Sequence, residues 1–389
     1  MREPVPVLQI VNQFAIGGAE GQFVARVRAH PAGFRPVVAC VHKKGPNLTA
    51  LEEMGLPVEE FGLQGSLARL NTGHQILRLA AFIARERVKL VHANDFYANL
   101  LAVPAARLSG ARVIASRFDL GHWYSRAHHV LEAIASRGAD AVYTNAEAVR
   151  DMCVDQEGIP AERVFVVHNG LDLAEFDRIS RLPLQGEVPQ LAIGADGKSV
   201  RPTVMVAANL YPVKGHLDLV EAVEIVRRTV PEVLVLCAGE GPMREVLEQQ
   251  ISARGMRDSF VLLGHRLDVP ALLKLVHVGC LPSHAEGLSN AAIESMAASL
   301  PVVATAVGGN VELVTEAGVR ASGHLVAPHK PAALAERLAG LLRDPARCAA
   351  LGAAGRSRVE TDLTLAAMSR KTGELYEHVL AGRKERLAA

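Results

Sequence analysis

The sequence predicts an α/β protein of two doubly wound domains, each a parallel sheet with helices on both faces. Short apolar runs alternate with helical patterns along the whole length, and most runs are continuously hydrophobic, which is typical of strands buried on both faces. Two successive series of strands and helices have similar size, which indicates two domains. The chain of 389 residues, 49% of them hydrophobic, is long enough for both at about 100–200 residues per domain.

The predicted strands form two series. In the first half they are expected over Val5–Val11, Arg35–Val41, Lys89–Ala93, Arg112–Ala115, Ala141–Thr144 and Val164–Val167. In the second half they are expected over Thr203–Ala207, Leu234–Ala238, Phe260–Leu263, Gly279–Leu281, Pro301–Thr305 and His324–Val326. From Pro331 onward Ala, Leu, Arg and Glu dominate with helical periodicity, which predicts helices and no further strand.

Composition also suggests the domain boundaries. Residues 181–201 hold several prolines and glycines and show little periodicity, so this segment is the predicted linker. The first domain is expected over 1–180 and the second over 202–364. The final helical stretch is longer than one domain needs, so a helix over 365–389 is expected to pack back on the first domain.

Composition narrows the classes of function as well. Lys and Arg number 42 against 41 Asp and Glu, so the chain lacks the basic excess of a nucleic-acid binder. Five cysteines stand singly, without a CxxC pair, which indicates reduced thiols rather than a disulfide framework or a zinc site. The N-terminus lacks a signal-peptide pattern, and no apolar run approaches ~20 residues. We therefore expect a cytoplasmic protein.

The segment richest in chemistry follows a predicted strand of the second half. Ser289 or Asn290 can cap a helix there, and the backbone N–H groups from Leu288 onward would form an anion site. Glu286 lies just before this helix and Glu294 about two turns along it. Glu286 could accept hydrogen bonds from sugar hydroxyls near the anion, and Glu294 could bridge two ribose hydroxyls. An ordinary capped helix with solvated glutamates is the alternative.

Several motifs carry a resemblance to a known family. The stretch EGLSNAAIE, from Glu286 to Glu294, resembles the E-x7-E motif of retaining glycosyltransferases of the GT-B fold, family 4, also called glycosyl transferases group 1. Other motifs agree with this family in order, so that the resemblance covers essentially the full chain: Gly17-Gly18-Ala19-Glu20, His168-Asn169-Gly170-Leu171-Asp172, Lys214-Gly215-His216, Gly239-Glu240-Gly241-Pro242 and Val307-Gly308-Gly309-Asn310.

The resemblance implies that the first domain binds an acceptor and the second a nucleotide-diphosphate sugar, in a cleft between them. Lys214 and Glu286 would be catalytic, because charge that builds on the leaving phosphate needs a fixed cation and N–H dipoles. The implied donor-binding residues are Gly17, Gly18, Asn209, His265, Arg266, Leu288, Ser289, Asn290, Glu294, Gly308 and Gly309. Plain turns are the alternative for the glycines, and a solvated loop for His265 and Arg266.

The sequence predicts no metal and no cofactor. No two aspartates are separated by a single residue, so the D-x-D metal signature is missing, and transfer is expected to be metal-independent, as in the family it resembles. The glycine spacing does not match G-x-G-x-x-G, so a nicotinamide-dependent dehydrogenase is unsupported.

Two positions depart from the family's pattern. Many members have arginine where this chain has Asn209, which donates only a neutral hydrogen bond, so Lys214 or another cation would have to compensate. Many also have a histidine after the fourth strand of the first domain, where this chain reads ASRFD. Whether Arg117, Asp119 or His122 takes that role stays open, and a loop residue or local ion pair is the alternative for each.

The acceptor side is expected on the first domain. His92 and Asp95 follow its third strand and could reach the cleft, with a satisfied loop histidine as the alternative for His92. Residues 121–137 combine Trp123 with basic side chains and could rest on a membrane that carries a lipid-linked acceptor. An ordinary amphipathic surface helix is the alternative.

These features together predict a retaining glycosyltransferase of the hexosyltransferase type. It would move a sugar from a UDP- or GDP-sugar to a hydroxyl of a glycan or lipid-linked acceptor, in cell-envelope or exopolysaccharide synthesis. We also expect the protein to contact the inner face of the membrane as a peripheral protein. The alternatives are a nucleotide-sugar epimerase or phosphorylase of the same fold, or a non-catalytic protein that binds sugar nucleotides.

Overall fold

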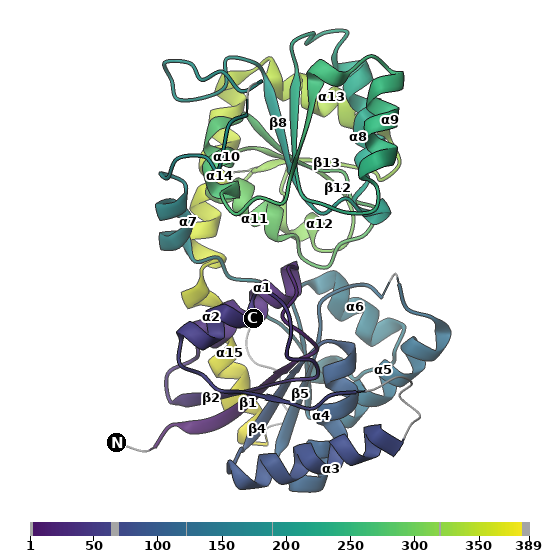
Figure 1. Ribbon diagram of the computed structural model, residues 1–389, viewed down its shortest axis with the longest axis vertical. Coiled ribbons are helices and arrows are strands. Elements are labelled where there is room, and N and C mark those ends of the chain that lie inside the picture. Colours follow the sequence, from purple (N-terminus) through teal and green to yellow (C-terminus); the bar gives the residue numbers. More distant parts are fainter. Residues whose placement is uncertain (1–2, 64–69, 122, 189, 319, 383–389) are drawn as a thin grey trace. The chain divides into compact units, whose positions relative to one another are not determined.

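The computed structural model describes residues 3–63, 70–121, 123–188, 190–318 and 320–382, and the chain divides into two compact units. The first unit joins Met1–Gly170 to Leu365–Ala389, and the second is Leu171–Thr364. Each unit is a parallel sheet with helices on both faces (Figure 1). The α/β class with two doubly wound domains is therefore confirmed.

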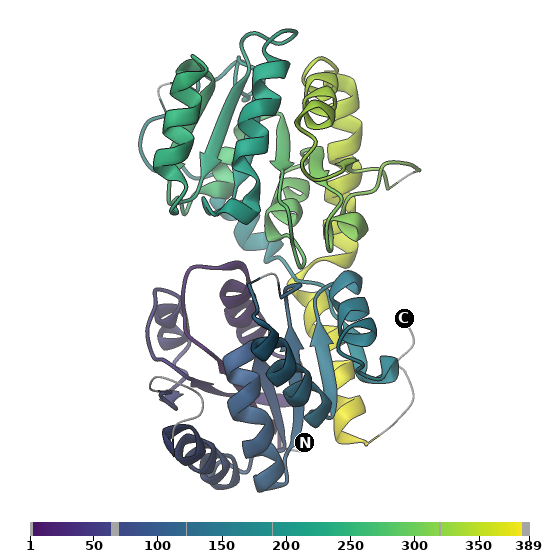
Figure 2. The ribbon, with the colours of Figure 1, turned by 90° about the vertical axis from the view of Figure 1, so that its right-hand side faces the viewer.

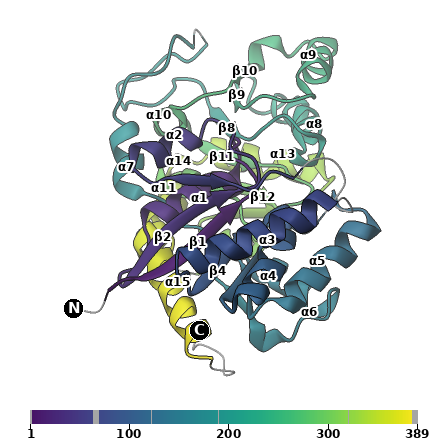
Figure 3. The ribbon, with the colours of Figure 1, turned by 60° about the horizontal axis from the view of Figure 1, so that its bottom comes forward.

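The first unit has a seven-stranded sheet in the order β3-β2-β1-β4-β5-β6-β7. All its pairs are parallel, as in the register that sets Val7 of β1 beside Leu90 of β4. Figure 3 shows β2, β1 and β4 side by side. The strands are β1 (Val5–Val11), β2 (Phe34–Cys40), β3 (Val58–Glu60), β4 (Leu90–Asn94), β5 (Arg112–Arg117), β6 (Ala141–Thr144) and β7 (Val164–Val166).

The helices of the first unit cover both faces of its sheet. Leu8 and Ile10 point to the face that α3 and α4 cover, while Val7 packs with α15 on the other face. This alternation follows from the two-residue period of a strand. The helices are α1 (Gly18–Arg28), α2 (Leu48–Glu53), α3 (Leu70–Arg85), α4 (Phe96–Ser109), α5 (Arg126–Gly138), α6 (Glu147–Asp155), the short 3₁₀ helix η1 (Ala161–Arg163) and α15 (Leu365–Leu380).

Strand β3 is the element of this sheet that the sequence did not predict. Its three residues, Val58–Glu60, include two glutamates, and only Val58 is buried. The strand forms an edge of the sheet and pairs with β2 alone. A short polar edge strand lacks the apolar run on which the other predictions rested.

A buried network of polar side chains attaches α15 to the sheet of the first unit. Gln9 Nε2 of β1 donates to the Tyr376 hydroxyl at 2.6 Å, and this hydroxyl shares a second hydrogen bond with Nδ1 of His92 at 2.8 Å. Met368, Leu375 and Val379 pack around Tyr376 in the same apolar cluster. Figure 2 shows α15, in yellow, lying along the unit that holds the N-terminal strands. The last helix is therefore an integral part of the first unit.

The second unit has a six-stranded parallel sheet in the order β10-β9-β8-β11-β12-β13. Its strands are β8 (Thr203–Ala207), β9 (Leu234–Ala238), β10 (Phe260–Gly264), β11 (Val278–Leu281), β12 (Val302–Thr305) and β13 (Gly323–Val326). Its helices are α7 (Leu173–Ile179), η2 (Pro212–Lys214), α8 (His216–Val226), α9 (Arg244–Ala253), η3 (Arg257–Ser259), α10 (Val269–Leu275), α11 (Asn290–Ala297), α12 (Asn310–Leu313), α13 (Pro331–Leu342) and α14 (Pro345–Asp362).

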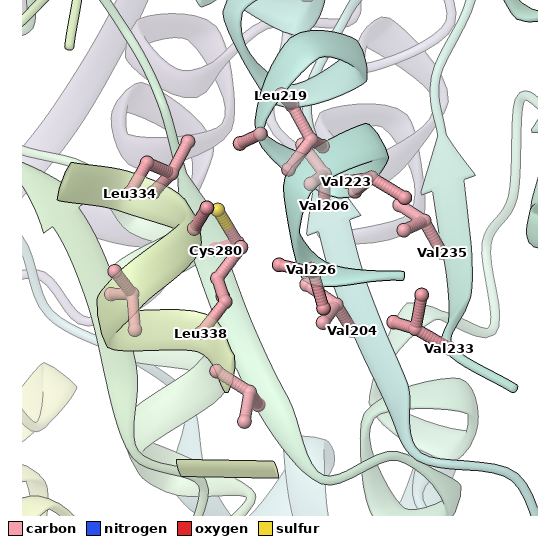
Figure 4. Close-up of a cluster of buried hydrophobic side chains, with 14 of the residues drawn as sticks. Val204, Val206, Leu219, Val223, Val226, Val233, Val235, Cys280, Leu334 and Leu338 are labelled. Carbon is pink, nitrogen blue, oxygen red and sulfur yellow. The ribbon is translucent and has the colours of Figure 1, made fainter. Parts of the chain in front are cut away.

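One core cluster of the second unit lies between its sheet, α8 and α13. Val204 and Val206 of β8 face Leu219 and Val223 of α8, and Leu338 of α13 completes the cluster beside Cys280 (Figure 4). All of these side chains are buried. This packing fixes the carboxyl end of β8, from which the next loop departs.

The predicted linker, residues 181–201, lies inside the second unit. That unit begins at Leu171, whose N–H donates to the Leu363 carbonyl oxygen at 2.8 Å. The Gln185 N–H donates to Asp268, and the Ser199 N–H donates to the Leu275 carbonyl oxygen. Its prolines and glycines led to the prediction of a linker, but these hydrogen bonds attach the segment to the two ends of α10.

Candidate functional site

The loops that follow β8 and β11 form the candidate site of the second unit. The strand order reverses between these two neighbours, because the chain runs outward from β8 to β9 and β10 and then returns to β11 on its other side. In open parallel sheets, ligands bind outside the carboxyl ends of the strands at such a reversal. Lys214 follows β8 and Glu286 follows β11. The topology therefore brings the two predicted catalytic residues to one place.

The turn that carries Lys214 fits closely against the end of β11. Gly215 has a φ of +66°, and a Cβ at this position would lie 1.9 Å from the Pro282 carbonyl oxygen. No other residue fits there, because both the positive φ and the contact exclude a side chain. The His284 N–H donates to the Val213 carbonyl oxygen at 2.7 Å and joins the two loops from the other direction.

Lys214 and Glu286 form an ion pair. Lys214 Nζ lies 2.8 Å from Glu286 Oε1, with the two side chains 27% and 10% exposed. The Ser283 hydroxyl donates to the same carboxylate oxygen at 2.7 Å. Glu286 is thus held from two sides, and the ammonium group keeps access to solvent, where an anion can approach. Ser283 was missed in the sequence, and its place between a strand end and a motif glutamate was the available signal.

Helix α11 begins directly after this pair. The Ser289 hydroxyl accepts from the Ala292 N–H at 3.3 Å, which makes Ser289 the N-cap of the two residues proposed for that role. Leu288 and Ser289 are buried. The positive end of the helix therefore lies just after Glu286, where its dipole favours an anion.

The loop after β12 closes the same site from a third side. Gly308 has a φ of +49°, and a Cβ there would lie 1.8 Å from the Glu286 carbonyl oxygen. The Gly309 N–H donates to the Gly287 carbonyl oxygen at 2.6 Å. Both glycines contact the backbone of the loop that carries Glu286. The absence of side chains at these two positions lets the loop after β12 approach the loop after β11 closely.

Glu294, the second glutamate of the motif, has a raised pKa. Its side chain keeps some exposed surface, yet burial raises the pKa of the carboxyl to about 7. A carboxylate placed where water solvates it poorly gains from hydrogen-bond donors.

We expect Glu294→Gln to increase stability at alkaline pH. The folded protein holds this proton up to about pH 7 and the unfolded chain releases it near 4.5, so between these values the folded state binds more protons and the free energy of unfolding falls as pH rises. Glutamine does not titrate, so the variant does not lose free energy of unfolding in this way. Thermal melts should show the variant above the wild type at about pH 8 and close to it at about pH 4. A difference in melting temperature between variant and wild type that does not grow with pH would contradict the raised pKa. The control is Glu248→Gln, on the surface of α9.

The other donor-side predictions lie around the carboxyl ends of β8 and β10. Asn209 is partly exposed after β8, and its carbonyl oxygen accepts from the Tyr211 N–H. His265 is exposed after β10. The Arg266 guanidinium donates to both carboxylate oxygens of Asp268 at 2.7 and 2.6 Å. Arg266 is therefore committed to a local ion pair, while His265 keeps its ring open to solvent.

The first unit has its own reversal of strand order, between β1 and β4. Gly17 caps α1 after β1 in extended backbone, and Gly18 begins that helix. A Cβ on Gly17 would lie 2.3 Å from a carboxylate oxygen of Glu20. Asp95 caps α4 after β4 with a φ of +85°, and burial raises the pKa of its carboxyl well above the usual range. Gly17, Gly18 and Asp95 thus all follow the two strands between which the strand order reverses.

Two acceptor-side predictions need correction. His92 lies inside β4, fully buried, and Ser116 Oγ and the Tyr376 hydroxyl bind its two ring nitrogens. Burial lowers the pKa of His92 well below its usual value. Arg117 is buried at the end of β5, where its guanidinium pairs with Glu157 and Glu132. Both side chains serve the core of the unit, because their polar atoms already have partners there.

The remaining predictions of this region differ in outcome. Asp119 accepts from the Gly121 N–H at 2.7 Å and from Trp123 Nε1 at 3.0 Å, so it organises the loop before α5. His122 lies outside the described residues. Trp123 is half exposed, and the apolar side chains of Val130 and Ile134 are more exposed still. Contact of this face with a membrane stays a prediction that binding to anionic liposomes would test.

Among the described residues, no helix is long and apolar enough to cross a membrane. Two doubly wound units of this kind form the GT-B fold. Residues 196–358 match the family described as glycosyl transferases group 1, and residues 17–175 match glycosyltransferase family 4. The chain belongs to this family of glycosyltransferases, whose donors are nucleotide sugars.

Curated relatives and a solved structure agree with this assignment. A GDP-mannose-dependent alpha-(1-6)-phosphatidylinositol monomannoside mannosyltransferase of Mycobacterium tuberculosis is 30% identical over 298 residues, which are 73% of this chain and 74% of the relative. A glycogen synthase of the same organism is 28% identical over 343 residues, 84% of this chain and 78% of the relative. The fold matches that of Anabaena HepE in complex with UDP-glucose, with a TM-score of 0.81, 22% identity and coverage of 96% and 99%.

Proposed function

We propose that this chain is a retaining, metal-independent glycosyltransferase that moves a hexose from a UDP- or GDP-sugar to a hydroxyl acceptor. The observation that carries the proposal is the Lys214–Glu286 pair, with Nζ and Oε1 2.8 Å apart, beside the N-terminus of α11. A cation and a helix N-terminus together form a site for a diphosphate. The carboxylate beside them suits the hydroxyls of the attached sugar.

In the proposed reaction the bond between the anomeric carbon and the β-phosphate oxygen breaks, and negative charge develops on the phosphate. Lys214 and the first N–H groups of α11 are placed to stabilise this charge, and because they are held in advance they need no reorganisation during the step. The acceptor hydroxyl attacks on the face that the phosphate leaves and passes its proton to the departing phosphate oxygen. The configuration at the anomeric carbon is therefore retained.

Glu286 has two tasks in this scheme. In the free protein it restrains the Lys214 side chain, whose flexible stem would otherwise sample many rotamers. With a donor bound, its second carboxylate oxygen is available to accept from sugar hydroxyls, since Lys214 Nζ and the Ser283 hydroxyl both contact Oε1. The same residue thus sets the position of the cation and of the sugar.

The donor and pathway are proposed from the relatives. One relative is named as dependent on GDP-mannose, and a protein of the same fold binds UDP-glucose. A glycan or lipid-linked acceptor in cell-envelope or exopolysaccharide synthesis fits such relatives. The acceptor is proposed to bind the first unit near Asp95.

A thermal-shift panel of UDP, GDP, ADP, TDP and their common sugar conjugates tests the proposal. A ligand that binds only the folded state raises the melting temperature as its occupancy rises, so we expect one nucleotide family to give a clear shift. Because no metal is proposed to hold the donor, EDTA should leave the size of this shift unchanged. A shift that disappears in EDTA and returns with a divalent ion would overturn metal independence. No shift with any nucleotide would overturn the donor site.

A further inference from the structure

Three side chains of the second unit converge outside the Lys214–Glu286 pair. Asp218 lies in the first turn of α8, His284 in the loop after β11, and His329 in the loop after β13. His284 Nε2 lies 3.0 Å and His329 Nδ1 3.6 Å from Asp218 Oδ2. The three atoms all lie within 4.8 Å of one another. Neither the proposed reaction nor the family motifs use Asp218 or His329.

The spacing of these atoms matches the ligand set of a metal ion. In a tetrahedral zinc site with bonds of about 2.05 Å, two ligand atoms lie about 3.3 Å apart. The two distances to Asp218 lie on either side of this value. Two imidazoles and one carboxylate favour zinc and similar transition metals, whereas calcium and magnesium take oxygen ligands.

The surrounding backbone holds the three groups in place. His284 is fixed by its N–H bond to the Val213 carbonyl oxygen, and Asp218 by its helix. His329 has a φ of +57°, which is uncommon for a residue with a side chain, and its ring lies 3.9 Å from that of His284 between centroids. This backbone conformation places the second imidazole beside the first.

We propose that Asp218, His284 and His329 bind one divalent transition-metal ion of the zinc type. Three protein ligands leave a fourth position, which water fills. The ion joins one helix and two loops at the carboxyl ends of the strands: α8, which follows Lys214, the loop that carries Glu286, and the loop after β13. Its effect is to raise the melting temperature of the folded protein, while the Lys214–Glu286 pair is held by its own contacts with Ser283 and needs no ion. It takes no part in the proposed transfer, so neither proposal depends on the other.

The test uses the full-length protein, freed of metal with a chelator that is then removed. Zinc is titrated by calorimetry, and cobalt(II) is added separately, because tetrahedral cobalt has characteristic visible absorption. We expect one equivalent of zinc, a rise in melting temperature with zinc, the tetrahedral cobalt spectrum, and no response to magnesium.

The decisive variant is His329→Asn. Asparagine tolerates a positive φ, and the His329 side chain is 65% exposed, so the variant should fold. Loss of an outer contact to a metal ligand costs about 10–100-fold in affinity, so loss of a ligand should weaken zinc binding at least tenfold. The matched control is His74→Asn, an exposed histidine of α3, which should bind zinc as the wild type does.

Two results would overturn the proposal. One is a lack of zinc binding to the wild type; the other is equal affinity in the wild type and His329→Asn, since the ligands then lie elsewhere. In either case His284 and Asp218 form only a hydrogen bond, with the His329 ring tilted against that of His284. Transfer assays separate this outcome from the proposed function, because turnover in EDTA depends on Lys214 and not on this cluster.

Discussion

We expect replacement of Lys214 by alanine to lower kcat about 10²–10³-fold, the range seen when one preorganised charge-stabilising donor is removed from an active site. The loss should fall on kcat more than on KM, because the cation acts on charge that develops during the reaction. Folding should change little. Glu286 keeps its bond from Ser283, and a partly exposed ion pair contributes only about 0–1 kcal/mol.

The measurement is steady-state transfer with the donor that the thermal-shift panel selects, together with a thermal melt of the same sample. Lys371→Ala is the matched control, because Lys371 is an exposed lysine of α15 in the first unit and its loss should leave turnover unchanged. Turnover of Lys214→Ala close to that of the wild type would remove Lys214 from the site. A large fall in melting temperature would assign the residue a structural role instead.

Glu286→Ala should lower kcat/KM about 10²-fold, somewhat less than the loss at Lys214, because the cation remains but its position is no longer fixed. Glu286→Gln separates shape from charge. An amide oxygen still accepts from the Ser283 hydroxyl and from Lys214 Nζ, so this variant should lie between alanine and the wild type. Melting temperatures should stay near that of the wild type.

The control for this pair is Glu248→Ala, an exposed glutamate of α9 that pairs with Arg244 on the surface. It should leave both turnover and melting temperature nearly unchanged. If glutamine and alanine at position 286 are equally active and close to the wild type, the carboxylate has no part in transfer. If glutamine is as damaging as alanine, the charge itself matters rather than the hydrogen bonds.

The sequence predicts most of the sheets because buried parallel strands require long apolar runs. Val204–Val206 and Val302–Val303 are of this kind, and both lie in central strands. Strand β3 offers only Val58 to the core, so hydrophobicity could not mark it. The bonds that place residues 181–201 on α10 are donated by the backbone N–H groups of Gln185 and Ser199, and a backbone donor carries no sequence signal.

The candidate site could be predicted only where its residues lie in motifs. Lys214 and Glu286 were found in this way, whereas the Asp218–His284–His329 cluster was not, since its members come from three separate elements. The predictions that His92 and Arg117 lie in the site were wrong for a different reason. Both are polar residues near strand ends, but tertiary packing buries them among polar partners. Sequence alone does not tell whether a polar side chain at a strand end faces the core or the ligand.

The return of α15 to the first unit has a consequence for the order in which the protein is completed. The second unit is one continuous segment inserted into the first, and its ends are adjacent, because Leu171 and Thr364 form a parallel bridge. During synthesis this segment is whole before the first unit is, since Tyr376 and its apolar neighbours are made after it. Until they emerge, Gln9 and His92 lack the hydroxyl that joins them, and the nascent first unit exposes one apolar face of its sheet. The second unit can therefore mature on the ribosome while the first unit still awaits α15.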